Sequence, residues 1–276
     1  MSNQTSKSSG LDEEWARNVW AAGDYSRTAK HYLPMAARLV DSVGIDPDDD
    51  ILDIGTGTGN LAITAAREGA TVNGVDICTK LLETAQRRVE SLGYGTITFD
   101  EGDAASLPYA DDTFDVTVSN LGHMYADPPT AAAEELIRVT RPGGRIGFTA
   151  WTPMSLYPRM AGVALQHVPP SALPAYTEPP FMWGDEGTVR NRINAKVGEL
   201  ATETLEIGYP TVDPEAFWAE MTETSGMFEK LITSLDDDEL QKLESDMITT
   251  IDLTFDAAEN IVPLSYLQTI ATLPKA

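Results

Sequence analysis

Short apolar runs alternate along the middle of the chain with longer segments whose apolar positions recur every three or four residues. A short run bounded by turn residues is typical of a buried strand, and the longer period is typical of a helix with one apolar face. The expected strands are 51–54, 71–76, 96–99, 114–119 and 145–151. The expected helices are 60–68, 79–92 and 130–140. Strands that alternate with helices of this length predict βαβ units and a parallel sheet covered on both faces.

The segments that flank this core, residues 45–151, have different patterns. Residues 1–10 are polar and rich in serine, so we expect a disordered tail. Residues 11–44 predict an N-terminal helical lid, with one helix over 11–22 and a second from 28 to 43. Residues 201–276 predict two more strands, 201–209 and 262–272, separated by helices near 214–221 and 226–248. These strands would complete a mostly parallel, seven-stranded, doubly wound α/β sheet of the Rossmann-like type.

The regular pattern is lost over residues 152–200, where seven prolines lie between Pro153 and Pro180 among aromatic residues and methionines. An insertion of this kind on a regular α/β sheet favours a cap over a pocket. The alternative is a surface excursion whose aromatic side chains cover an apolar sheet edge. In the first case the cap would enclose a ligand with Trp151, Tyr157, Tyr176, Phe181, Met182 and Trp183.

The chain is strongly acidic, with 43 Asp and Glu against 19 Lys and Arg and a formal net charge of −24. No basic stripe is visible, which argues against a nucleic-acid partner. Such a surface charge is typical of salt-adapted, halophilic proteins, and an acidic protein from a low-salt source is the alternative. Cys78 is the single cysteine, no apolar run is long enough to cross a membrane and no apolar leader is present. We therefore expect a cytoplasmic protein.

A glycine turn, Gly55-x-Gly57-x-Gly59, follows the first expected strand and precedes a helix. Glycine allows positive φ and a close approach of ligand to backbone, and the helix N-terminus adds free N–H groups and partial positive charge. A small ligand with a polar or negative part is expected there. The spacing matches neither the dinucleotide pattern G-x-G-x-x-G nor a phosphate-binding loop with Gly-Lys-Ser/Thr.

Polar side chains also follow the next three expected strands. Asp76 lies 17 positions after Gly59 at the end of the second strand, where a carboxylate can accept both hydroxyls of a ribose. Asp103 follows the third strand, and Asn120 follows the fourth. Ligands of open α/β sheets bind at the carboxyl ends of the strands, so these residues are expected to surround one site.

At these residues the chain resembles the class I S-adenosylmethionine-dependent methyltransferases, and most of all the small-molecule enzymes of the ubiquinone/menaquinone-biosynthesis type. The segments that carry the resemblance are 52–59, 74–77, 102–109, 114–116 and 141–145. It implies S-adenosylmethionine as cofactor and S-adenosylhomocysteine as product.

The resemblance also implies roles for single residues. Asp53 and the turn would hold the methionine half of the cofactor, Asp76 the ribose hydroxyls, and Asp103 the adenine amino group. The full implied set is Tyr25, Asp53, Gly55, Thr56, Gly57, Gly59, Asp76, Ile77, Asp103, Ala104 and Asn120. Asp53 could instead only accept backbone N–H groups of the turn, and Asp103 could be an ordinary turn residue.

Methyl transfer from a sulfonium is an in-line displacement, in which alignment in a desolvated site is the main requirement. We expect the acceptor to be a small, partly apolar molecule. A base helps some acceptors, and His123, in the loop after the fourth strand, is the candidate; the alternative is a structural histidine. Three widely separated histidines and one cysteine suggest no metal site. Other possibilities are a non-catalytic, nucleotide-binding regulatory protein and an NAD-dependent oxidoreductase.

Overall fold

The computed structural model describes residues 13–168 and 174–275 and contains one seven-stranded sheet in the order β3-β2-β1-β4-β5-β7-β6. The strands are β1 (Asp50–Ile54), β2 (Thr71–Asp76), β3 (Ile97–Glu101), β4 (Phe114–Asn120), β5 (Thr140–Trp151), β6 (Glu199–Pro210) and β7 (Ile261–Thr272). The first five pair in parallel, and β7 pairs antiparallel with both β5 and β6. The predicted Rossmann-like fold is confirmed.

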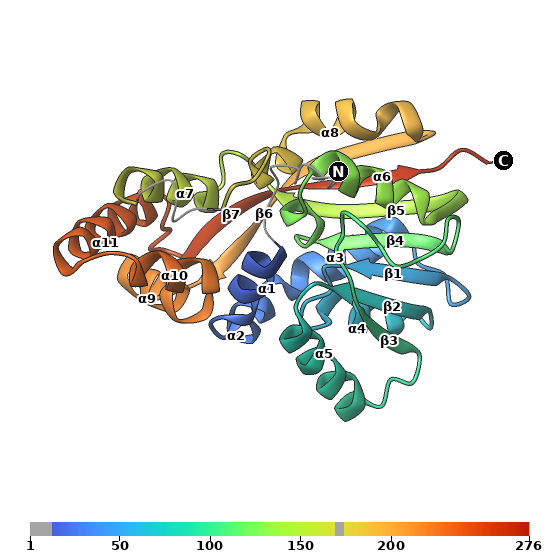
Figure 1. Cartoon of the computed structure of the whole chain (residues 1–276), viewed down its shortest axis with the longest axis horizontal. Helices are drawn as coiled ribbons and strands as arrows, with labels where there is room; N and C mark the ends of the chain where they lie inside the picture. Colours follow the sequence, from blue (N-terminus) through green and yellow to red (C-terminus); the bar gives the residue numbers. More distant parts are fainter. Residues whose placement is uncertain (1–12, 169–173, 276) are drawn as a thin grey trace, which may run out of the picture.

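Helices cover both faces of the sheet (Figure 1). On one face lie α3 (Leu33–Val43), α4 (Asn60–Ala66) and α5 (Thr79–Leu92), whose apolar side chains form a common core with Ile51, Val72 and Val116. On the other face lie α6 (Pro129–Arg138) and α8 (Glu186–Ile193), which pack with Ile146 and Phe148. Strand residues buried from both sides explain the continuous apolar runs of the sequence.

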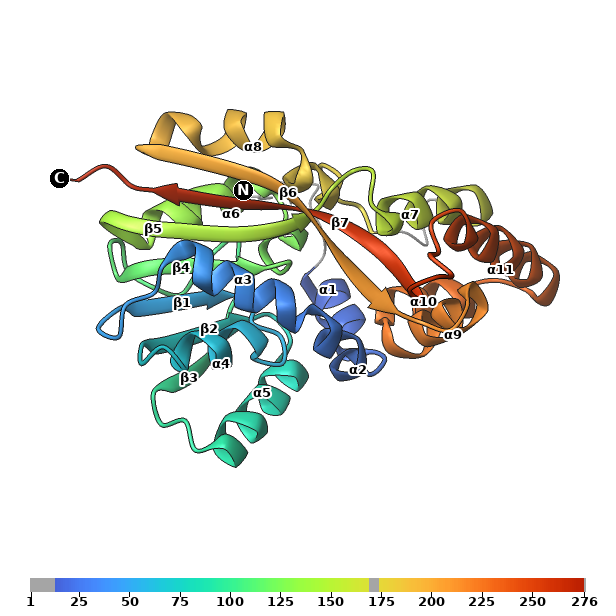
Figure 2. The same cartoon turned by 180° about the vertical axis from the view of Figure 1, so that it is seen from behind.

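The remaining helices gather beyond the carboxyl ends of the parallel strands (Figure 2). They are α1 (Glu13–Ala21), α2 (Tyr25–Ala29), α7 (Leu156–His167), α9 (Pro214–Thr224), α10 (Gly226–Thr233) and α11 (Asp237–Asp252). The twelve-residue strands β6 and β7 extend past the core, and the chain between them forms α9, α10 and α11. The ligand-binding edge of the sheet is therefore covered by helices from both ends of the chain.

Several predicted element boundaries are wrong. The single helix expected over 28–43 is divided, since α2 and a 3-10 turn (Lys30–Tyr32) precede α3, which has Pro34 in its first turn. The helix expected near 226–248 is two, because α10 ends at Thr233 and Asp236 caps α11. Residues 152–200 contain α7 and α8, which the loss of pattern did not predict. The expected tail, 1–10, lies outside the described residues.

Candidate functional site

The glycine turn joins β1 to α4 by a backbone path that other residues would strain. Gly55, Gly57 and Gly59 have φ of +65°, +55° and +80°. A Cβ on Gly55 would lie 2.6 Å from Cα of Gly122, so the turn packs directly against the loop that follows β4. The N–H groups of Gly55 and Thr56 donate to the carbonyl of Val75, at 2.8 and 3.0 Å. The turn is thus fixed to the ends of both β2 and β4.

Asp53 supports this turn from inside the protein. Its Oδ2 accepts from the Thr56 hydroxyl at 2.6 Å and from the N–H of Ala62 at 3.0 Å. The side chain is buried and does not line the cavity described below. Burial raises the pKa of Asp53 to about 7. Asp53 thus holds the turn, a role that is compatible with cofactor binding, and neither Asp53 nor Thr56 nor Gly59 lies on the cavity wall.

Asp76, by contrast, is both a structural acceptor and part of the wall. Its two oxygens accept from the N–H groups of Gly57 and Cys78, each at 2.8 Å. A carboxylate has about four lone-pair sites, so both oxygens can accept further hydrogen bonds from a ligand. Burial raises the pKa of Asp76 to about 6 although its backbone partners lower it.

The other predicted binding residues lie around the same opening. Ile77, Asp103, Ala104 and Asn120 all line the cavity. Asp103 Oδ1 accepts from the N–H of Ala105 at 2.9 Å, and burial raises the pKa of its carboxyl group. Asn120 Oδ1 accepts from the Thr149 hydroxyl at 2.8 Å, which fixes that side chain against β5.

The cavity has a volume of about 660 Å³ and runs along the carboxyl ends of the strands. Its lining changes in character along the sheet. The carboxylates that line it are Glu13, Asp76, Asp103 and Asp127, and both Glu13 and Asp127 act electrostatically on Asp103. We call this part the acidic end. Because β5 lies three strands from β2, roughly 14 Å at the usual strand spacing, the side chains that follow β5 form a separate end.

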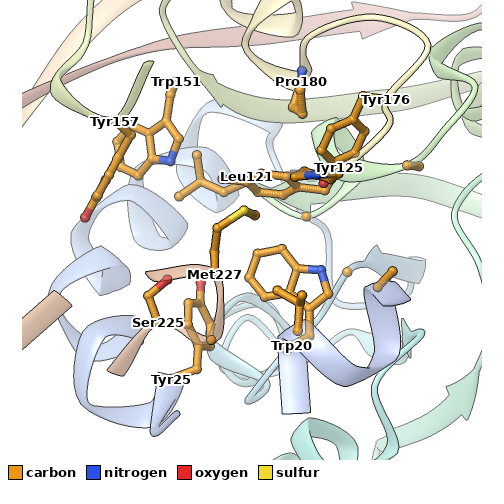
Figure 3. Close-up of a pocket in the computed structure, with 18 of the residues that line it drawn as sticks. Trp20, Tyr25, Leu121, Tyr125, Trp151, Tyr157, Tyr176, Pro180, Ser225 and Met227 are labelled. Atoms are coloured by element: carbon orange, nitrogen blue, oxygen red, sulfur yellow. The ribbon is translucent and has the colours of Figure 1, made fainter. Parts of the chain in front are cut away.

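Aromatic and thioether side chains make up this second part, which we call the aromatic end (Figure 3). Trp151 lies 5.4 Å from the ring of Tyr32 and 5.2 Å from that of Tyr157, measured between centroids. Met221 and Leu231, from α9 and α10, close it. Figure 3 shows Met227 extending between this group and the side chains of Trp20 and Tyr25.

The N-terminal helices form the wall opposite the sheet. Trp20 packs edge-on against Tyr25 and Tyr125, with centroid separations of 6.0 and 5.0 Å. The Tyr25 ring lies 3.7 Å from the position that a Cβ on Gly57 would take. The structure thus brings Tyr25, which the resemblance implies as a cofactor-binding residue, next to the glycine turn. Burial, with the charge of Asp76, raises the pKa of Tyr25 to about 12.

His123 does not face this cavity, and the prediction that it does is wrong. Its ring is fully buried between Phe148 and Trp183, with centroid separations of 4.5 and 4.6 Å. Burial and the nearby Arg192 lower the pKa of His123 to about 3. The reason is the turn after β4, where Leu121 has φ of +67° and the Ser119 hydroxyl accepts the N–H of His123 at 2.9 Å. This hydrogen bond directs the next residues into the core.

The residues that line the cavity differ from the prediction in two further ways. Trp183 was expected in the cap, but it is part of the apolar core; the other five expected cap residues line the cavity. The helices α9 and α10 were not expected there at all, although they contribute Met221, Met227 and Leu231. Their apolar positions were visible in the sequence, but nothing local indicates that a chain segment so far from the glycine turn folds over it.

No group of three metal-ligating side chains occurs among residues 13–168 and 174–275. Nor does the described part of the chain include a helix that is long and apolar enough to cross a membrane.

Comparisons with known proteins, in sequence and in fold, find methyltransferases. A family model for a methyltransferase domain matches residues 51–144, from β1 into the start of β5. An uncharacterised protein of Mycobacterium tuberculosis is 38% identical over 187 residues, 67% of each chain. Nocamycin O-methyltransferase of Saccharothrix syringae is 32% identical over 221 residues, covering 71% of this chain and 77% of its own.

Among solved structures, phosphoethanolamine N-methyltransferase 2 of Haemonchus contortus in complex with S-adenosyl-L-methionine has a TM-score of 0.55. It is 18% identical and covers 88% of this chain and 53% of that chain, so this likeness is one of fold. The sequence relatives, the domain match and the fold agree, and the chain belongs to the class I S-adenosylmethionine-dependent methyltransferases.

Proposed function

We propose that the chain transfers the methyl group of S-adenosylmethionine to a small, partly apolar molecule. The proposal rests on one observation: the lining of a single cavity changes from carboxylates at one end to aromatic side chains at the other. The ribose hydroxyls and the adenine amino group of the cofactor are hydrogen-bond donors, and the four carboxylates of the acidic end can accept from them, whereas an apolar acceptor suits the aromatic end.

The residues present fit the cofactor. Asp76 would accept the ribose hydroxyls with its remaining lone pairs, Ile77 would lie against the adenine, and Asp103 would accept from the adenine amino group. The backbone of Gly55 and Gly57 would lie beside the methionine half, and Tyr25 would cover it. When bound, the cofactor supplies an activated methyl group.

The chain's own part in the reaction is to align and to exclude water. Trp20 packs on both Tyr25 and Tyr125, and all three rings line the cavity. Alignment in a closed cavity removes the entropic cost of bringing two molecules together and keeps water from the reacting atoms. The O-methyltransferase relative is consistent with a small acceptor.

The test combines binding with turnover. Calorimetry is expected to show that S-adenosylmethionine and S-adenosylhomocysteine each bind to one site per chain. Incubation with methyl-labelled cofactor and a panel of small acceptors is expected to transfer the label. If neither cofactor form binds, at low or high salt, the proposal fails. Binding without transfer to any acceptor would favour the regulatory alternative.

A further inference from the structure

The aromatic end contains a pair of hydroxyl groups with an unusual arrangement. The hydroxyl oxygens of Tyr32 and Tyr157 are 2.6 Å apart. The Tyr157 hydroxyl also donates to the thioether sulfur of Met221 at 3.6 Å. Each hydroxyl has one proton, so Tyr32 is the donor to Tyr157 and the proton of Tyr157 is directed at sulfur. A thioether is a weak acceptor, and an oxygen of a ligand would replace it.

Two threonines at this part of the wall already have hydrogen-bond partners within the protein. Thr28 donates to Thr224 at 2.6 Å, and Thr224 donates to the carbonyl of Glu220 at 2.7 Å. Tyr157, which receives a hydrogen bond from Tyr32, is a strengthened donor, because donation into a hydroxyl polarises it.

Among the residues that the structure describes, no general base of ordinary type is available to a molecule at this end. None of the three histidines lines the cavity, and among the described residues its carboxylates belong to the acidic end. Lys230 lines the cavity but lies over the ring of Trp15, 5.7 Å from its centroid. Burial raises the pKa of both Tyr32 and Tyr157 well above that of free tyrosine, so these hydroxyls stay protonated and act as donors.

We infer that the methyl acceptor is an oxygen acid on a flat apolar skeleton, bound as its anion, and that Tyr157 positions its oxygen. The inference rests on the proposed function. A lone pair of the acceptor oxygen forms the O–C bond, the S–C bond breaks, and its electron pair stays on the sulfur. The acceptor brings no proton to be removed, so the step needs no base, and the opposite charges of anion and sulfonium are both cancelled. Carboxylic acids, acidic phenols and enolised dicarbonyls share this chemistry.

The test uses 4-nitrophenol, whose absorbance reports its ionisation, with 4-nitroaniline as a neutral analogue of the same shape. In the S-adenosylhomocysteine complex, the wild-type protein is expected to bind the phenolate in preference to both the phenol and the aniline. Tyr157→Phe should reduce phenolate affinity by roughly 10- to 100-fold, the usual effect of a hydrogen bond to a charged group, and leave nitroaniline affinity unchanged. Tyr109→Phe is the matched control, since its hydroxyl bonds Asp100 at 3.0 Å outside the cavity.

Any of four results would overturn the inference: the wild-type protein binds phenolate and aniline equally, prefers the neutral phenol, or takes up no phenolate, or Tyr157→Phe has the same phenolate affinity as the wild type. Calorimetry with S-adenosylhomocysteine on the same samples separates this failure from that of the proposed function. If the cofactor product binds and phenolate is not preferred, only the acceptor assignment is wrong. If the cofactor product does not bind, the proposed function itself is wrong.

Discussion

At the scale of residues, two aspartates at the ends of neighbouring strands have different roles because they face different groups. Both are buried and both are close to backbone N–H groups, but only Asp76 reaches the cavity. The sequence predicted the positions of Asp53, Asp76 and Asp103 at the carboxyl ends of strands. It could not predict which way a side chain turns there, and for that reason His123 was wrongly expected at the reacting centre.

Replacement of Asp76 by Asn tests the ribose assignment. An amide nitrogen cannot accept a hydrogen bond, so the variant loses a hydrogen bond either from a ligand hydroxyl or from a backbone N–H group that Asp76 now accepts. We predict that its affinity for S-adenosylhomocysteine falls by roughly 10- to 100-fold in calorimetry. Asp115→Asn is the control, because Asp115 pairs with Arg141 and does not line the cavity. Equal affinities in the two variants would contradict the assignment.

The carboxyl group of Asp53 should make the stability of the ligand-free protein depend on pH. Its folded-state pKa, raised to about 7 by burial, lies above the unfolded value of about 4. The folded state therefore holds the proton more tightly, and this contribution to stability is complete below pH 4 and lost as the pH rises through 7. Denaturant unfolding between these pH values should show the decline, and Asp53→Asn should reduce its slope. An unchanged slope in the variant would show that other groups cause it.

At the scale of elements, the strand-and-helix pattern predicted the core well, since strands buried on both faces produce continuous apolar runs. Helix α7 was missed although Leu156, Met160 and Ala164 recur at helical spacing and are buried. The prolines before and after this helix made its apolar period hard to recognise in the sequence. The covering of the cavity by α9 and α10 could not be predicted, because it depends on contacts between distant parts of the chain.

Helices α10 and α1 pack so closely that adding a single methyl group between them should disturb the contact. A Cβ on Gly226 would lie 1.9 Å from the carbonyl oxygen of Val19. Gly226→Ala should therefore push the helices apart, lower the free energy of unfolding by about 1–3 kcal/mol and weaken ligand binding. Gly95→Ala is the control, since nothing lies within 4 Å of a Cβ there. Unchanged stability and unchanged affinity in Gly226→Ala would show that the contact is not needed.

At the scale of the whole molecule, the net charge of −24 is expected to affect stability. Described ion pairs such as Arg17–Glu101 and Arg38–Glu203 link distant segments across the surface, yet acidic side chains exceed basic ones by more than two to one. Repulsion among like charges opposes the compact state and is screened by salt. We predict that the free energy of unfolding rises as potassium chloride is added from low to molar concentration. Full stability at low salt, with no further increase, would contradict salt adaptation.

In the proposed function, one cavity holds the cofactor at its acidic end and the methyl acceptor at its aromatic end. A crystal structure of the S-adenosylhomocysteine complex would test this arrangement. We predict the ribose at Asp76, the adenine beside Ile77 and Asp103, and the sulfur near Gly55 and Asn120, facing open space beside Trp151 and Tyr157. If adenine lay at the aromatic end, or if the ligand lay outside this cavity, the proposed arrangement would be wrong.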